Sequence, residues 1–164
     1  MRKYCEECGK EVEETYDVCG EAVEVDAQVQ VCAECGEEFF CEELDNATLI
    51  LAYNEYRRKH KLLLPEEIRK IREQYGLSQR SFAKLLNWGD KTICRYENGS
   101  IQDKAHNSLL LFLREPENMR TYLTENEIIL GERQKEKLLV VVGQLEEYRR
   151  LPINYKPPFR QSFF

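Results

Sequence analysis

Two pairs of cysteines near the start of the chain have the spacing of a metal site. Cys5 with Cys8, and Cys32 with Cys35, each form a C-x-x-C-G sequence. A tight turn in each pair, relieved by the glycine that follows, leaves both sulfur atoms able to point at one ion. Four thiolates in a tetrahedral arrangement suit Zn²⁺, with Zn–S distances of about 2.3 Å. Because four protein ligands leave no position for water, we expect one structural zinc per chain.

Other uses of these cysteines fit the sequence less well. Disulfides are typical of secreted proteins, but the chain begins with a short basic segment that leads directly into the first cysteine pair, without a signal peptide. A redox dithiol would be expected within a βαβ pattern, and neither pair has one around it. The remaining cysteines, Cys19, Cys41 and Cys94, are expected to be free thiols. For Cys94, packing as a small side chain and a redox switch both stay open.

A stretch of about 40 residues in the middle of the chain predicts three short helices joined by tight turns. The first begins at Pro65 and ends at Gly76, the second is capped by Ser78, and the third runs roughly from Asp90 to Asn98. Asn87 stands between the second and third helices, where the turn needs a left-handed residue that Asn tolerates. The caps and turns therefore agree on a helix-turn-helix unit.

Polar residues of this unit are candidates for DNA contact. They lie at the start of its second helix and on the outward face of its third: Gln79, Arg80, Lys91, Thr92 and Arg95. Arg95 has a planar guanidinium that can donate two hydrogen bonds to guanine, and Lys91 lies one turn away on the same face. Gln79, at a helix N-terminus, is expected to hold a phosphate.

Charge is divided unevenly along the chain. Residues 1–46 hold 15 acidic and 3 basic side chains, whereas residues 57–114 hold 6 acidic and 13 basic ones. The formal net charge of −6 therefore combines an acidic head with a basic body. A basic helix-turn-helix body suits DNA, and an acidic head suits a basic protein partner.

The helix-turn-helix unit resembles the lambda-repressor-like (Xre/Cro) DNA-binding domain. The matching residues are Leu77 to Gln79, Phe82, Ala83 and the run from Thr92 to Gly99. The chain departs from that pattern at three positions: Asn87 replaces the usual turn glycine, Gly89 the usual cap serine, and Cys94 the usual serine. The first two changes weaken the caps without removing the motif.

The order of the two motifs resembles the MqsA (YgiT-type) antitoxins, which are encoded beside a toxin. The similarity covers roughly residues 1–115. It implies a structural zinc on the four paired cysteines, toxin binding by the N-terminal domain, and operator binding by a homodimer. Lys91 and Arg95 fall at the base-contacting positions of that family's recognition helix. The family has an asparagine where this chain has Lys91, so its operator sequence is not carried over.

We therefore expect an α+β fold that is mostly α, in four parts. These are a small β zinc ribbon (1–44), a helical linker (45–63), a lambda-repressor-like helix-turn-helix bundle (64–115), and a C-terminal helical extension with a tail (116–164). Apolar residues alternating from Val23 to Val31 predict a strand of the ribbon, and they are candidates for contact with a toxin. The basic run from Arg57 to Lys61 ends the linker helix and is expected to be solvated, with a phosphate contact as the alternative because it lies beside the DNA-binding domain.

The C-terminal extension contains one further helical pattern. Thr124 to Glu127 has the form of a capping box, which predicts a helix start there. Leu138, Val142 and Leu145 form the apolar stripe of a helix over residues 132–150. With little chain left to cover this stripe, packing within the chain and packing across a dimer are both open. Residues 151–164 predict no fold of their own.

No enzyme is expected, because the sequence has neither a phosphate-binding loop nor a catalytic triad. Its two histidines, His60 and His106, have no partners nearby in sequence. The first hypothesis is an antitoxin that binds a basic, ribonuclease-like toxin and represses its own operon through a palindromic operator. The alternative is a zinc- or redox-responsive regulator without a toxin. No apolar run is long enough to span a bilayer, so a cytoplasmic protein without membrane contact is expected.

Overall fold

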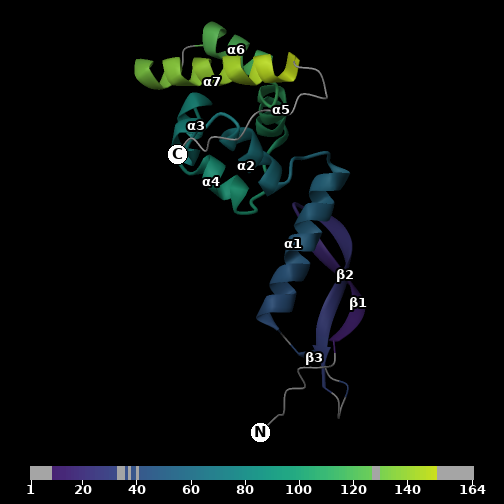
Figure 1. Cartoon of the computed structure of the whole chain (residues 1–164). Helices are drawn as coiled ribbons and strands as arrows, with labels where there is room; N and C mark the ends of the chain where they lie inside the picture. The colour runs from purple at the N-terminus through teal and green to yellow at the C-terminus, as the bar shows by residue number, and fades with distance from the viewer. Residues whose placement is uncertain (1–8, 33–35, 37, 40, 127–129, 151–164) are drawn as a thin grey trace.

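The acidic head folds as an antiparallel sheet covered by one long helix (Figure 1). The structure, a computed structural model, describes residues 9–32, 36, 38–39, 41–126 and 130–150. Strands β1 (Gly9–Val18), β2 (Glu21–Val31) and β3 (Glu38–Phe39) lie in the order β1-β2-β3. Cys19 and Gly20 form the turn between the long strands, both with positive φ (56° and 82°), which matches the twist of a two-residue hairpin. The predicted ribbon strands are confirmed.

Helix α1 (Glu42–Lys59) packs along β2, over the apolar side of the sheet. Ala52 of α1 is fully buried against Val18 and Val23, while Ala27 and Val29 are buried farther along β2. The segment expected to be a linker is therefore helical, but it belongs to the head because it covers the sheet. The expectation that the alternating valines contact a toxin is wrong, since α1 covers that side.

The basic body contains the predicted helix-turn-helix. Its helices are α2 (Pro65–Glu73), α3 (Gln79–Leu85), α4 (Thr92–Glu97) and α5 (Lys104–Leu113). Ser78 caps α3 as expected, because its hydroxyl oxygen accepts a hydrogen bond from the Ser81 backbone N–H at 3.1 Å. Asn87 has a φ of 54°, which confirms the left-handed turn between α3 and α4.

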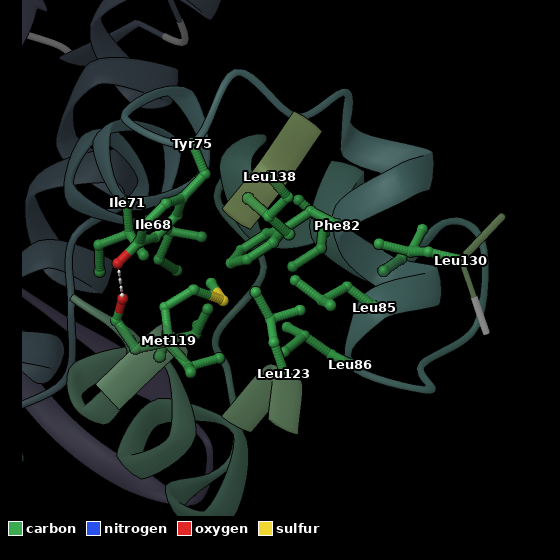
Figure 2. Close-up of a cluster of buried hydrophobic side chains, with 14 of the residues drawn as sticks. Ile68, Ile71, Tyr75, Phe82, Leu85, Leu86, Met119, Leu123, Leu130 and Leu138 are labelled. Atoms are coloured by element: carbon green, nitrogen blue, oxygen red, sulfur yellow. Dashed lines mark hydrogen bonds between the residues drawn. The ribbon is translucent and has the colours of Figure 1, made fainter. Parts of the chain in front are cut away.

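Two further helices complete the body's core. They are α6 (Pro116–Glu125) and α7 (Glu132–Arg150). Met119 and Leu123 from α6, with Leu138 and Val142 from α7, are buried in the same cluster as Phe82 (Figure 2). The predicted apolar stripe of α7 therefore packs within the chain.

The predicted helix start at Thr124 is wrong. Thr124 lies in the last turn of α6, where its hydroxyl donates a hydrogen bond to the Thr121 carbonyl at 2.9 Å. A threonine hydroxyl can bond either to the N–H groups of a helix it begins or to the carbonyls of a helix it ends. Because α6 starts at Pro116 and already includes Thr124, the hydroxyl bonds to a carbonyl of that helix.

Head and body meet where α1 ends. Arg57 is 1% exposed, and its guanidinium donates hydrogen bonds to the Gly99 carbonyl (2.5 Å), just after α4, and to Asn54 (3.1 Å). This burial lowers the Arg57 pKa from its ordinary value. Arg57 was expected in a solvated basic run, and that expectation is wrong because the helix-turn-helix body covers it.

The segment after α1 is bound to the body through its backbone. Asn107 accepts a hydrogen bond from the Leu63 N–H (2.8 Å) and donates one to the Lys61 carbonyl (3.3 Å). Gln102 donates to the Leu63 carbonyl at 2.7 Å. These side chains replace the solvent that would otherwise bond a loop backbone, so the joint between head and body is fixed.

Candidate nucleic-acid interface and metal centre

The outward surface of the helix-turn-helix carries Lys91 and Arg95. Lys91 is the residue before the first turn of α4, and Arg95 follows one turn later. Both side chains are exposed, while Ile93 and Tyr96 on the other side of α4 are buried in the core. The short helix therefore presents two cations side by side, and its apolar face fixes their direction.

Arg80 and Gln79, at the start of α3, have different surroundings. Arg80 is exposed and pairs with Asp90 at 3.0 Å, which links α3 to the turn before α4. Such an exposed pair contributes little to stability, so a phosphate can compete for the guanidinium. Gln79, expected to hold a phosphate, donates a hydrogen bond to Glu97 at 2.7 Å. That bond orients the Gln79 amide at the edge of the surface.

Thr92 does not lie on the outward face, and its predicted position there is wrong. It is only 8% exposed. Helix α4 begins at Thr92 rather than at Asp90, and the Thr92 N–H donates to the Gly89 carbonyl at 2.9 Å. Its hydroxyl oxygen lies 3.4 Å from where a Cβ would stand on Gly89. The side chain therefore packs against the turn that precedes the helix.

A buried carboxylate joins the three helices of the motif. The Glu97 side chain is fully buried and accepts hydrogen bonds from Arg72 Nε (2.6 Å) and Arg72 Nη2 (3.0 Å), in addition to the bond from Gln79. Arg69 lies 3.5 Å away. Burial raises the Glu97 pKa, but the hydrogen bonds and the positive charges outweigh burial, so the pKa lies below its ordinary value.

Sequence reasoning did not identify this cluster. One pattern in the sequence pointed to this cluster. Arg72 and Glu97 each directly follow an apolar residue, Ile71 and Tyr96, that is predicted to face the core. An acidic and a basic residue at such positions indicate a buried pair. His106, for which the sequence showed no partner, also has one, because its Nδ1 lies 2.7 Å from the Tyr96 hydroxyl and its ring stacks on Trp88.

Cys32 is the predicted zinc ligand that falls within the described residues, and Cys5, Cys8 and Cys35 lie outside them. Cys32 directly follows β2, and its carbonyl accepts a hydrogen bond from the Gly36 N–H at 2.9 Å. Gly36 has a φ of 72°. This hydrogen bond and the positive φ of Gly36 are what a C-x-x-C-G turn needs. Gly9, the residue after Cys8 in the sequence, pairs with Gln30 near the end of β2 that Cys32 follows. Over the described residues, this arrangement is compatible with Cys32 acting as one ligand of a four-thiolate site.

The three other cysteines have surroundings of a different kind. Cys19 is exposed at the opposite end of the hairpin, about 30 Å along the ten residues of β1. The Cys41 thiol donates to the Glu43 carboxylate at 3.3 Å, and the Cys94 sulfur accepts a hydrogen bond from Asn98 at 3.4 Å. Among the described residues, no group of three or more metal-binding side chains comes together.

The fold joins a cysteine-bearing ribbon to a helix-turn-helix body, and this architecture places the chain in the class of two-domain helix-turn-helix proteins. Residues 5–121 match the family described as the antitoxin component of a bacterial toxin–antitoxin system, MqsA. The match covers more than half of the chain, and the chain belongs to this antitoxin family. It includes the head and the helix-turn-helix and ends before α7. No curated protein matches the sequence. Among the helices that the structure describes, none has the length and apolar character needed to cross a bilayer.

Proposed function

We propose that this antitoxin represses its own operon by binding a palindromic operator as a homodimer. The observation that carries the proposal is the exposed pair Lys91 and Arg95 on α4, whose inner face is fixed by the core and by Glu97. In a dimer, two such helices would enter major grooves about 34 Å apart, one turn of the duplex. Lys91 and Arg95 would contact bases, and Gln79 and Arg80 would contact phosphates.

Replacing Arg95 with alanine tests the base contact. The change is expected to cost about 1–3 kcal/mol of operator binding and to relax the base preference, because a bidentate contact to guanine is lost. Arg80→Ala is the matched control, since this exposed arginine is assigned to phosphate and should weaken operator and random DNA alike. Binding is measured by fluorescence anisotropy on both duplexes. Equal losses on both for Arg95→Ala would remove the base-reading role.

We also propose that Cys5, Cys8, Cys32 and Cys35 hold a structural Zn²⁺. The hydrogen bond from the Gly36 N–H to the Cys32 carbonyl supports this proposal, as does the pairing of Gly9 with Gln30 near the end of β2 that Cys32 follows. The bound ion would supply folding free energy to a head in which the described residues form only a small apolar core. The cysteines would act only as ligands.

For the toxin, we propose a binding surface on the outward side of α1. Leu49, Ile50 and Leu51 are 36%, 59% and 50% exposed, which is unusual for three consecutive large apolar residues. Leu51 lines a groove of about 330 Å³ that also contains Glu24, Asp26 and Glu55, and Arg58, which pairs with Glu55 at 3.1 Å. Exposed apolar side chains beside an excess of carboxylates suit a basic, ribonuclease-like toxin.

The Ile50→Asp variant tests this surface. A buried charge and the loss of isoleucine contact are expected to weaken toxin binding at least about tenfold, since burying such a side chain is worth about 1.5–3 kcal/mol. The probe is the protein encoded next to this gene, and affinity is measured by calorimetry with the full-length chain. Val140→Asp is the control, because Val140 is equally exposed (61%) but lies on α7. A similar loss in both variants would remove the α1 surface from the proposal.

A further inference from the structure

Helix α7 lies beside the helix-turn-helix, although it is outside the residues that match the antitoxin family. Figure 1 shows α7 running across the body next to α3 and α6. A groove of about 460 Å³ separates the first half of α7 from the turn between α2 and α3. Gln134, Lys137 and Val141 line one side of this groove, and Ser78 and Ser81 line the other. The C-terminal extension thus borders the start of α3.

The orientation of α7 is fixed on two sides. An α-helix turns about 100° per residue, so Gln134, Lys137 and Val141 share the side that faces α3. On the side that faces α6, Glu146 accepts two hydrogen bonds from Arg120, at 2.8 and 2.7 Å. Between these two sides Leu138 enters the core. Rotation of the helix would break all three sets of contacts, so Lys137 is held next to α3.

Positive charge gathers on this part of α7. Lys137 is exposed, and Arg133, one turn earlier and also exposed, lies on the same side of the helix. The acidic residues of the segment, Glu132 and Glu136, are rotated by more than about 100° from the centre of the groove-facing side. The side toward α3 is therefore basic, and it adjoins Ser78, the residue before Gln79 and Arg80.

We propose that Lys137, supported by Arg133, contacts the DNA backbone and extends the DNA interface onto the C-terminal helix. The inference rests on the proposed DNA-binding function, which places phosphates at the start of α3. A lysine ammonium acts on a phosphate as a point charge and needs no fixed geometry. Such a contact carries no base preference, so it would add affinity and not specificity.

The test measures how DNA affinity of the full-length protein depends on salt. Each phosphate contact adds about 0.9 to the slope of log K against log salt concentration, so Lys137→Ala should reduce that slope by about one. The same reduction is expected on a duplex of the promoter region upstream of the gene and on a random duplex of equal length. Lys137→Arg should keep the slope. Lys135→Ala, on the α6 side of the same helix, is the control and should also keep it.

Arg95→Ala, measured alongside, separates this inference from the function on which it rests. If Arg95→Ala weakens promoter binding while Lys137→Ala leaves the slope equal to that of Lys135→Ala, the helix α7 contact is overturned and the DNA-binding function stands. If neither variant weakens binding, both are overturned. Thermal unfolding of each variant checks the fold, which an exposed lysine side chain should not affect.

Discussion

Replacing Cys32 with serine is expected to release zinc and unfold the head while the body stays folded. Over the described residues, the head's apolar cluster contains Val18, Val23 and Ala52 with a few half-buried neighbours, and Ala27 and Val29 are buried farther along β2. Structural zinc supplies about 10–16 kcal/mol in zinc-finger peptides, which is far more than such a cluster can replace. The body has a separate and larger core, so unfolding of the head should not spread beyond the junction into the body.

The single tryptophan makes this outcome measurable. Trp88 lies in the body, stacked on His106, so its fluorescence reports unfolding of the body alone. Zinc content reports the metal site, and far-ultraviolet circular dichroism, which sums over the whole chain, reports the head as a difference from wild type when the Trp88 transition is unchanged. In Cys32→Ser we expect less than one equivalent of zinc, loss of strand signal, and unchanged thermal unfolding of Trp88. Cys19→Ser, at the other end of the hairpin, should keep the ion. A full equivalent of zinc in Cys32→Ser would show that the ligand assignment is wrong.

Removing Arg72 is expected to have the second largest effect. Arg72→Ala leaves the Glu97 carboxylate buried without its main partner, and breaking such a pair typically costs about 3–5 kcal/mol. Arg80→Ala is the control, because its pair with Asp90 lies in the same body, is exposed and is worth less than about 1 kcal/mol. The free energy of unfolding is measured in urea through Trp88. Equal costs for the two variants would mean that the buried pair does not stabilise the motif.

The loss of unfolding free energy caused by Arg72→Ala is expected to depend on pH in one direction. In the native protein the Glu97 pKa is lowered, so its contribution to stability is present above the ordinary carboxyl pKa and is lost as pH falls through the lower, folded value. Without Arg72, its hydrogen bonds and positive charge no longer lower the pKa, so the Glu97 pKa is expected to rise relative to the native protein. Protonation on acidification would then relieve the unpaired charge. The destabilisation by Arg72→Ala should therefore shrink as the pH is lowered toward the carboxyl range.

Local chemistry made much of the fold predictable. Pro65, Ser78 and Asn87 each fix one backbone geometry through their own side chains, so caps and turns of the helix-turn-helix could be placed without tertiary information. The alternating residues of β2 fixed its two faces in the same way. The paired cysteines and the order of the motifs indicated the antitoxin family, to which the chain belongs.

The failures concern residues whose environment is set by distant parts of the chain. Arg57 has the sequence context of a solvated cation, and only the loop at Gly99, far along the chain, covers it. Thr92 is turned inward because α4 begins at that residue, a boundary that propensities place within a few residues at best. The covering of the sheet by α1 likewise depends on long-range packing, which periodicity within the helix did not show.

The buried Arg57 and the bonded segment after it fix the position of the head relative to the body, which bears on the proposed complex with DNA and toxin. Over the described residues, the head is not tethered by a freely rotating spacer, so a toxin captured on α1 would be held at one distance and one bearing from the operator. On a dimer bound to its palindrome, the separation of two captured toxins would follow from the spacing of the half-sites. The spacing of the half-sites on the DNA would therefore set the dimensions of the whole assembly.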